Sequence, residues 1–155
     1  IGIINTPFTD LKNMPIQPAG ARGIRGHIDL LPQLAPALSD LDGFSHAFLI
    51  YHFHRSEGYK LMVKPFLDTV KRGLFATRAP KRPNAIGQSL VRIQQITDNR
   101  IDICDVDILN GTPLLDIKPY VPTFDTVDNV RFGWLERSSD RTSETRSDDR
   151  FCQDD

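Results

Sequence analysis

The cations of one short loop are the first residues whose types and spacing suggest chemistry. Residues 76–89, ATRAPKRPNAIGQS, contain Arg78, Lys81 and Arg82, and Pro83 follows directly. The proline ring fixes its own φ and biases the preceding residue toward extended backbone, so these side chains are expected to be held in place at little entropic cost. Guanidinium groups held in this way suit carboxylates, phosphates or nucleobase edges. A solvated turn between strands is the structural alternative.

Two histidines in the segment YHFHR suggest a second kind of chemistry. In an extended strand His52 and His54 share one face, from which two imidazoles can bind a metal ion, and Glu57 follows closely. The sequence contains no histidine after His54 to complete such a site, although His27 and His46 lie upstream. A metal centre therefore stays open, and we prefer histidines that face the interior or a ligand.

Two further loops carry residues that let the backbone approach a ligand closely. Residues 105–122, DVDILNGTPLLDIKPYVP, contain Asn110-Gly111, a dipeptide typical of tight turns. Residues 14–23, MPIQPAGARG, form a second connection rich in Pro and Gly. The polar side chains near the first turn are Asp107, Asp116, Lys118 and Tyr120. We interpret both segments as loops at the ends of a barrel.

Short strands must position these loops. Apolar runs and apolar–polar alternation predict seven strands, at residues 1–5, 22–31, 44–53, 60–66, 73–78, 89–96 and 100–109. Apolar spacing over residues 32–43 predicts a single helix that ends at Gly43. This density of strands predicts a mainly β fold, either a barrel or a sandwich, with function in its loops.

Length and composition limit the architecture and the partners. With 155 residues, 39% of them hydrophobic, the chain is long enough for one domain with a core and too short for two of ordinary size. The 19 Lys and Arg nearly balance 20 Asp and Glu, so the overall charge does not indicate a nucleic-acid-binding protein. Cys104 and Cys152 suggest neither a disulfide framework nor a zinc site, which favours a reducing, cytoplasmic location. No apolar run approaches the roughly 18 residues of a membrane span.

The C-terminal residues differ in composition from the rest. Residues 138–155, SSDRTSETRSDDRFCQDD, are polar and of mixed charge, with Phe151 as the large apolar residue. We expect a solvated helix or a disordered tail. Docking of Phe151 on a partner subunit is the alternative.

The residues alone indicate a β domain that binds an anionic or nucleotide-like ligand. The glycine-rich dinucleotide and phosphate motifs and the GxSxG elbow are absent from the sequence. Four segments are nevertheless specific in combination: PIQPAGARGIRG, LDGFSHAFLIYHFHRS, ATRAPKRPNAIGQS and DILNGTPLLDIKPYVP. In this order they resemble the TsaA-like family, whose TrmO-type members are tRNA methyltransferases. The similarity covers residues 1–137.

The resemblance implies a fold, a cofactor and a reaction. It implies a single β-barrel domain at residues 1–137 with one or two short helices, followed by the polar tail at 138–155. It further implies binding of S-adenosyl-L-methionine without a Rossmann sheet, and a homodimer with the cofactor site near the subunit interface. The implied reaction is methylation of N6 of threonylcarbamoyladenosine at position 37 of tRNA, beside the anticodon, without a metal ion.

Family positions carry over residue by residue. The implied cofactor-binding residues are Pro18, Ala19, Gly20, His54, Arg55, Arg78, Gln88, Asp107, Ile108, Leu109 and Asn110. Gln88 and Asn110 depart from the family pattern, which has an apolar residue and Asp there. The candidates for tRNA contact are Arg82, Asn84, Lys118 and Tyr120, and a basic face of Arg22, Arg25, Lys81 and Arg82 would attract the RNA. The sequence identifies no catalytic residue that orients or deprotonates the acceptor.

Two other functions stay open at this point. A module that binds S-adenosylmethionine or a nucleotide and regulates a partner needs the same pocket but transfers no methyl group. A metal-dependent β-barrel enzyme would use His52 and His54.

Overall fold

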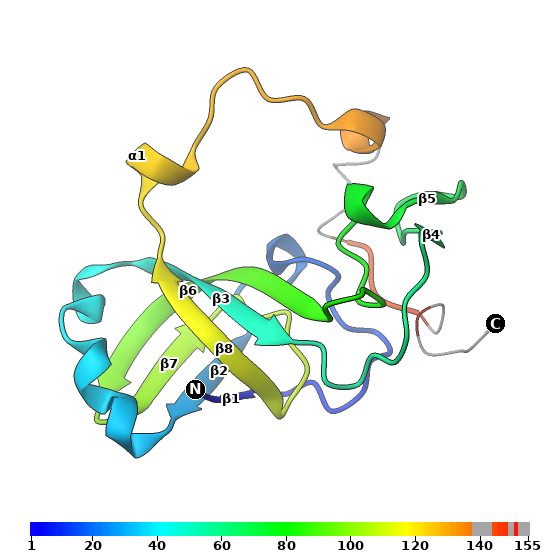
Figure 1. Cartoon of the computed structure of the whole chain (residues 1–155). Helices are drawn as coiled ribbons and strands as arrows, with labels where there is room; N and C mark the ends of the chain where they lie inside the picture. Colours follow the sequence, from blue (N-terminus) through cyan, green and yellow to red (C-terminus); the bar gives the residue numbers. More distant parts are fainter. Residues whose placement is uncertain (138–143, 149–150, 152–155) are drawn as a thin grey trace.

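A closed barrel of antiparallel strands forms the body of the protein in a computed structural model that describes residues 1–137, 144–148 and 151. Around the barrel the strands follow the order β1–β2–β7–β6–β3–β8 (Figure 1). Their bounds are β1 Gly2–Asn5, β2 Arg25–Leu30, β3 His46–His52, β6 Ile86–Thr97, β7 Arg100–Cys104 and β8 Thr112–Pro119. Closure leaves each of these strands paired on both sides, so the barrel has no open edge.

Several short elements lie outside the barrel strands. A two-stranded ribbon of β4, Met62–Val63, and β5, Arg72–Gly73, stands beside it, and α1, Pro122–Asp125, follows β8 (Figure 1). The 3-10 helices are Pro18–Gly20, Pro32–Leu38, Leu41–Gly43, Leu74–Ala76 and Gly133–Arg137. No helix in the described part of the chain is long and apolar enough to cross a membrane.

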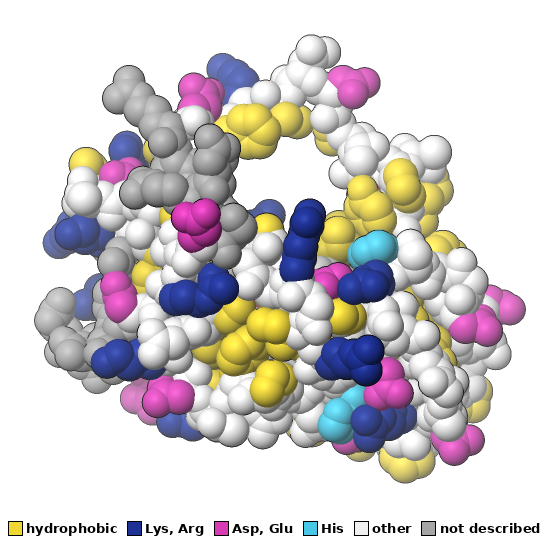
Figure 2. Space-filling model, turned by 180° about the vertical axis from the view of Figure 1, so that it is seen from behind, with side chains coloured by type: hydrophobic (Ala, Val, Ile, Leu, Met, Phe, Trp, Pro, Cys, Tyr) yellow, Lys and Arg dark blue, Asp and Glu magenta, His cyan; other side chains and the backbone are white. Residues whose placement is uncertain are grey.

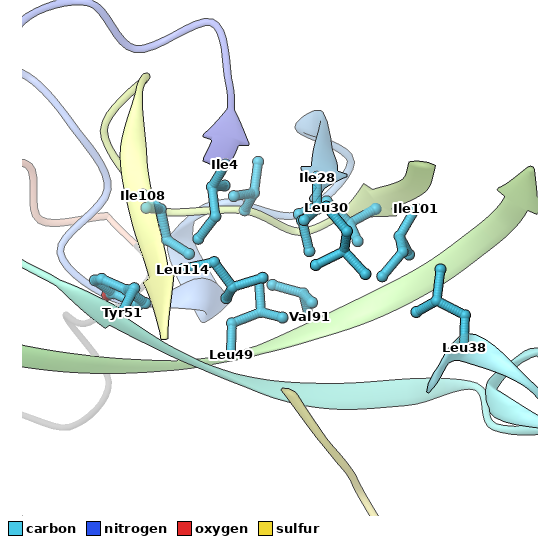
Figure 3. Packing of buried hydrophobic residues seen from close by; sticks show 12 residues of the cluster. Ile4, Ile28, Leu30, Leu38, Leu49, Tyr51, Val91, Ile101, Ile108 and Leu114 are labelled. Atoms are coloured by element: carbon cyan, nitrogen blue, oxygen red, sulfur yellow. The ribbon is translucent and has the colours of Figure 1, made fainter. Parts of the chain in front are cut away.

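The barrel interior is filled by aliphatic side chains from every strand. Ile4, Ile28, Leu49, Val91 and Leu114 meet there from five different strands, all almost fully buried (Figure 3). Each such side chain contributes roughly 1.5–3 kcal/mol when taken out of water. Alternation along each strand sends every second residue into this core, as the pattern of β3 shows.

The pairing of β3 with β8 contains a register shift near the end of the barrel that carries the pocket loops. Ile50 pairs with Asp116 but Tyr51 pairs with Leu114, so β8 has one extra residue, Leu115, at this point. Such a bulge bends the strand and re-aims the side chains beyond it. Tyr51 thereby lies at one end of the core cluster, at the opposite end from Leu38 (Figure 3).

The prediction of one helix over 32–43 is wrong. Pro36 lacks a backbone N–H for a longer helix, and Asp40 takes a left-handed conformation with φ of 64°, so the segment divides into two 3-10 helices. The 73–78 prediction is also wrong in type, because Leu74–Ala76 turns into a 3-10 helix directly after β5.

Strand β8 is absent from the sequence-based prediction. We read residues 105–122 as a loop because of Asn110-Gly111 and the prolines, yet the turn simply precedes a strand that begins at Thr112. Pro113 fits because it is the second residue of that strand. Conversely, the predicted strand 100–109 ends at Cys104, after which Asp105 has a φ of 68°. The other barrel strands form within a few residues of their predicted positions.

The C-terminal residues that the structure describes pack against the rest of the chain. Ser147 exchanges backbone hydrogen bonds with Asn13 and Met14, and Phe151 lies edge-on to Phe66 at 5.0 Å between ring centroids. Phe151 therefore docks on its own chain in this structure. The domain boundary at residue 138 stays a prediction, and Cys152 lies outside the described residues.

Adjacent leucines on β8 test the barrel core. Leu114 is 1% exposed inside the barrel, whereas Leu115 is 44% exposed on the outside. We expect Leu114→Ala to lower the free energy of unfolding by about 2–5 kcal/mol, since the cavity cannot collapse fully. Leu115→Ala should cost less than about 1 kcal/mol. Urea denaturation of both variants measures the difference, and equal costs would contradict the assigned register.

Candidate functional site

A pocket of about 340 Å³ opens where β3 ends and β6 begins. Segments far apart in the sequence line it: residues 11, 14–17, 51, 53–56, 77, 78, 80, 82, 86–88, 107–109 and 112, with Phe66, Ser147, Asp148 and Phe151. Apolar side chains gather on one face of the molecule with Lys and Arg around them (Figure 2). The pocket combines apolar walls with a few charged groups, the combination that holds cofactors in most proteins.

A hydrogen-bonded chain of three side chains forms one wall. Ser89 Oγ donates to Asp107 Oδ1 at 2.6 Å, and the Tyr51 hydroxyl lies 3.1 Å from Ser89 Oγ. Because Ser89 uses its only proton on the carboxylate, Tyr51 must donate to Ser89. The three residues come from β3, β6 and the loop after β7, so the chain exists only in the closed barrel.

Gly87 makes room for this arrangement. A Cβ atom at position 87 would lie 2.3 Å from Cε2 of the Tyr51 ring and 2.8 Å from the Phe53 ring. Only glycine lets these two aromatic side chains cross β6 at this point. This requirement accounts for the glycine in the segment RPNAIGQS.

The pKa values of the chain reflect its surroundings. Burial raises the pKa of Asp107 to about 6, against the opposing effects of the Ser89 hydrogen bond, its own backbone and the positive charge of Arg78. Burial and the nearby Asp107 charge raise the pKa of Tyr51 far above its usual value. At neutral pH Asp107 is thus an ionised carboxylate in a poorly hydrated wall, where it favours a cationic ligand group.

Arg78 is held at the pocket by a neighbouring loop. Its Nη1 donates to Gln17 Oε1 at 2.9 Å. Gln17 is itself fixed because the 3-10 helix Pro18–Gly20 begins directly after it, with Gly20 N donating to Gln17 O. A guanidinium group has further donors in its planar fork, which suit a carboxylate.

The loop after Arg78 folds upon its own cations. Arg82 Nη1 donates to the carbonyls of Thr77 and Ala79 at 3.0 and 3.2 Å, and its guanidinium stacks on Phe75. Lys81 is 6% exposed. The sequence-based prediction of a stiffened loop is correct in effect, but Arg82 itself supplies part of the stiffening.

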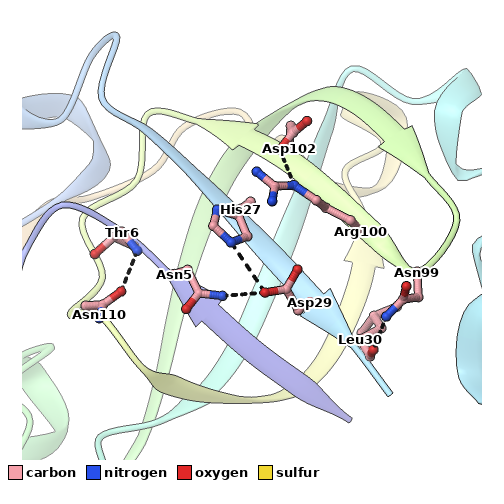
Figure 4. Close-up of polar contacts among 9 residues, drawn as sticks. All are labelled: Asn5, Thr6, His27, Asp29, Leu30, Asn99, Arg100, Asp102 and Asn110. Atoms are coloured by element: carbon pink, nitrogen blue, oxygen red, sulfur yellow. Dashed lines mark hydrogen bonds and ion pairs between the residues drawn. The ribbon is translucent and has the colours of Figure 1, made fainter. Parts of the chain in front are cut away.

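The Asn110-Gly111 turn is fastened to the first strand. The Asn110 side chain accepts from Thr6 N at 3.0 Å (Figure 4), while Asn110 N and Gly111 N donate to Phe8 O and Ile4 O. Thr112 Oγ1 also donates a hydrogen bond to the carbonyl oxygen of Leu109, at 2.7 Å. Asn110 therefore acts as a brace and does not line the pocket.

The histidine pair does not share a strand face. β3 ends at His52, and His54 lies in the following turn, 3.4 Å from Thr112 Oγ1 through its Nδ1. Burial, with Arg55 and His52 nearby, lowers the pKa of His54. The described residues contain no cluster of three or more His, Cys, Asp or Glu that could hold a metal ion. The geometric premise of the metal-dependent enzyme is therefore wrong.

The pocket collects most of the residues expected to bind the cofactor. Those that line it are His54, Arg55, Arg78, Gln88, Asp107, Ile108 and Leu109, while Pro18, Ala19, Gly20 and Asn110 are not among its lining residues. Their role in binding remains a prediction. The sequence reasoning missed Tyr51, Phe53 and Gln17, which also line the pocket; inward alternation along β3 was the available signal for Tyr51.

The candidates for tRNA contact are scattered. Arg82 lines the pocket, whereas Asn84 is an exposed neighbour of it. Lys118 pairs with Asp116, and Tyr120 packs edge-on to Phe48. Lys118 is the second-last residue of β8 and Tyr120 follows the strand, so both lie roughly 20 Å or more from its pocket end at about 3.3 Å per residue.

Comparison with known proteins identifies the family. A family model described as the tRNA-methyltransferase O N-terminal domain matches residues 3–126. The chain belongs to the TrmO family. The resemblance read from the four sequence segments is thereby confirmed, and so is the mainly β barrel fold.

Relatives and solved structures agree with this family. A probable S-adenosyl-L-methionine-binding protein of Pyrococcus abyssi is 51% identical over 97% of this chain and 82% of that protein. The human tRNA (adenine(37)-N6)-methyltransferase is 31% identical over 84% of this chain but 31% of its own length. The crystal structure of TrmO from Pseudomonas aeruginosa superposes with a TM-score of 0.72, at 40% identity, over 86% of this chain and 60% of that one. This chain thus spans less than two thirds of the last two proteins.

The raised pKa of Asp107 has a measurable effect on stability. Between about pH 4 and pH 6 the folded protein keeps this proton while the unfolded chain releases it, so stability falls as the pH rises through this window. Asp107→Asn removes that titration. The stability of the variant relative to wild type should therefore increase by about 2 kcal/mol from pH 4 to pH 7 in urea denaturation.

Ser89→Ala provides the second variant for this test. Without the hydrogen bond that lowers the pKa of Asp107, the window should extend to higher pH. A difference between Asp107→Asn and wild type that does not change with pH would contradict the account of this wall.

Proposed function

We propose that this protein is an S-adenosylmethionine-dependent methyltransferase that methylates N6 of threonylcarbamoyladenosine at position 37 of tRNA. The observation that carries the proposal is the apolar pocket with Asp107 and Arg78 at its wall, in a chain of the TrmO family. Relatives at 31% and 51% identity are named for adenine-37 methylation of tRNA and for S-adenosylmethionine binding.

The pocket residues fit the chemical groups of this cofactor. Phe53, Ile108 and Leu109 offer apolar surface for an adenosine. The Arg78 guanidinium suits a carboxylate, and the ionised Asp107 carboxylate suits an ammonium or sulfonium group. Arg78 and Asp107, which are two of the charged residues of this largely apolar pocket, thus offer partners for the negative and the positive groups of a zwitterionic ligand that carries an extra positive charge.

The reaction requires little acid–base catalysis from the protein. When bound, S-adenosylmethionine supplies a methyl group on a sulfonium, whose departure leaves a neutral thioether. The pocket residues have to position the acceptor nitrogen in line and exclude water. The carbonyl on N6 of the acceptor withdraws electrons and eases loss of its proton, so a weak base or water suffices.

The charges that meet tRNA lie outside the pocket. Arg22 and Arg25, which we expected on a basic face, are exposed at the start of β2. Lys81 is buried and does not belong to that face, which corrects our expectation. With a net charge of −1, affinity must come from local clusters, and tRNA binding should weaken as salt increases. We also propose a cytoplasmic location, in keeping with a tRNA substrate.

Transfer of labelled methyl groups tests the activity directly. Wild-type protein should label tRNA that carries threonylcarbamoyladenosine and leave an unmodified transcript unlabelled. Arg78→Ala should lose at least about tenfold in kcat/KM, since a charged hydrogen bond contributes roughly 1.5–3 kcal/mol. Arg100→Ala, which breaks an exposed pair with Asp102 on β7, serves as the matched control and should keep full activity.

The alternative outcome of this experiment is equally definite. Calorimetric binding of the cofactor without label in either RNA would identify a sensor of S-adenosylmethionine. Label in both RNAs would leave a methyltransferase but remove threonylcarbamoyladenosine as its required acceptor.

We further propose that the protein acts as a homodimer. After β8 the chain leaves the barrel as an arm, residues 121–132, that arches outward and returns at Trp134, whose Nε1 donates to Ala76 O (Figure 1). Phe124 and Val127 on this arm are 79% and 72% exposed, and an opening separates the arm from the barrel (Figure 2). Apolar side chains held away from the core in this way suit burial against a second subunit.

Substitution on the arm tests the dimer. Phe132, at the end of the arm, is 60% exposed. The variant Phe124→Ser with Phe132→Ser should shift the molecular mass from dimer to monomer in analytical ultracentrifugation, because both rings leave the proposed interface. Leu31→Ser, at an exposed leucine next to β2, is the control and should remain dimeric. A wild-type protein that sediments as a monomer at micromolar concentration would refute the proposal.

A further inference from the structure

A second pocket of about 400 Å³ adjoins the first. Leu11, Arg55, Leu109 and Phe151 line both, so the two pockets share a wall. Arg55 is the charged member of this shared set. A ligand group in one pocket can therefore be covalently connected to a group in the other.

The second pocket differs from the first in chemistry. Beyond the shared residues it is lined by Thr9, Asp10, Glu57 and Lys81. With Arg55 the lining contains two cations, two carboxylates and one hydroxyl, and its apolar residues are those of the shared wall. Such a lining suits a small polar group that carries a carboxylate together with hydrogen-bond donors.

The first pocket already offers partners for the negative and the positive groups of the cofactor. Arg78 and Asp107 belong to it and do not line the second pocket. The second pocket is then left for the other reactant. The side chain on N6 of the acceptor ends in threonine, which has a carboxylate, a hydroxyl and a urea N–H within a few bonds of N6.

We propose that the second pocket holds the amino-acid end of the threonylcarbamoyl group of the acceptor, an inference that rests on the function proposed above. Arg55 and Lys81 face its carboxylate, while Thr9, Asp10 and Glu57 take its hydroxyl and urea hydrogens. The acceptor nitrogen then lies near the shared wall, next to the first pocket.

This arrangement explains why an unmodified adenosine would be a poor acceptor. Without the threonyl group, the acceptor offers no carboxylate or hydroxyl to the second pocket and loses the binding energy of those contacts. A site built to pair a substrate carboxylate discriminates strongly against a substrate that lacks it. The second pocket is thus a specificity determinant for the acceptor.

A substrate series tests the inference on the wild-type protein. Anticodon hairpins are prepared with threonylcarbamoyladenosine, with its carboxylate converted to a carboxamide, and with its hydroxyl replaced by hydrogen. We expect methyl transfer to the carboxamide hairpin to lose at least about tenfold in kcat/KM, and a smaller loss for the hairpin without the hydroxyl.

Variants connect this selectivity to the pocket. In Lys81→Met, kcat/KM for the natural hairpin should fall by about the factor that the wild-type protein loses on the carboxamide hairpin. The carboxamide hairpin should lose little further activity in this variant, because the contact is already absent. The calorimetric Kd for S-adenosylmethionine should stay within about twofold of the wild-type value. Glu57→Gln, at an exposed side chain, gives a second test by the same comparison. Its kcat/KM should fall on the natural hairpin and change little further on the hairpin that lacks the hydroxyl. Lys71→Met, on an exposed lysine that lines neither pocket, should behave as wild type.

The contrary results are distinct from each other. Equal transfer to the carboxylate and carboxamide hairpins by wild type overturns the inference and leaves the methyltransferase standing. A tenfold weaker cofactor Kd in Lys81→Met, with the carboxamide penalty unchanged, assigns the pocket to the methionyl end of the cofactor and also overturns it. If no hairpin is methylated at all, the proposed function itself fails, and the inference with it.

Discussion

Pairing of β3 with β8 closes the barrel, and the pocket depends on that closure. The pairing brings residues 51–56, at the end of β3, beside the turn that precedes Thr112. β3 pairs with β6 on its other side, which sets Tyr51 opposite Gly87. Because all three strands are held in a closed ring, a one-residue shift of register in one of them would turn the pocket residues of that strand to the wrong face.

Within that frame, a few polar groups are kept in poorly hydrated surroundings. The cost of burying the Asp107 carboxylate there is reduced because Ser89 donates a hydrogen bond to it and the charge of Arg78 lowers its pKa. The cost to stability is small compared with the barrel core, in which aliphatic side chains from all six strands meet. A rigid apolar barrel can therefore hold a charged wall without losing its fold, which is the condition for recognising a cationic ligand.

Charge in this protein is organised locally. The net charge of −1 hides a pocket wall with one anion, a neighbouring pocket of mixed charge and exposed arginines beside β2. The proposed reaction needs these separately, for a cofactor, a modified base and a phosphate backbone. Apolar surface is divided in the same way, between the core and the arm of residues 121–132.

The sequence alone indicates the family, the mainly β class and the loops that supply the pocket, because motifs and strand alternation are local properties of the chain. It misread β8 as a loop, since its prolines and the Asn110-Gly111 turn are also the signals of irregular structure. Only the tertiary structure decided that Ser89 joins Tyr51 to Asp107, that Asn110 braces β1, and that Lys81 lies in a second pocket. These contacts join residues from different strands and loops, and their geometry follows from barrel closure and register, which no local pattern encodes.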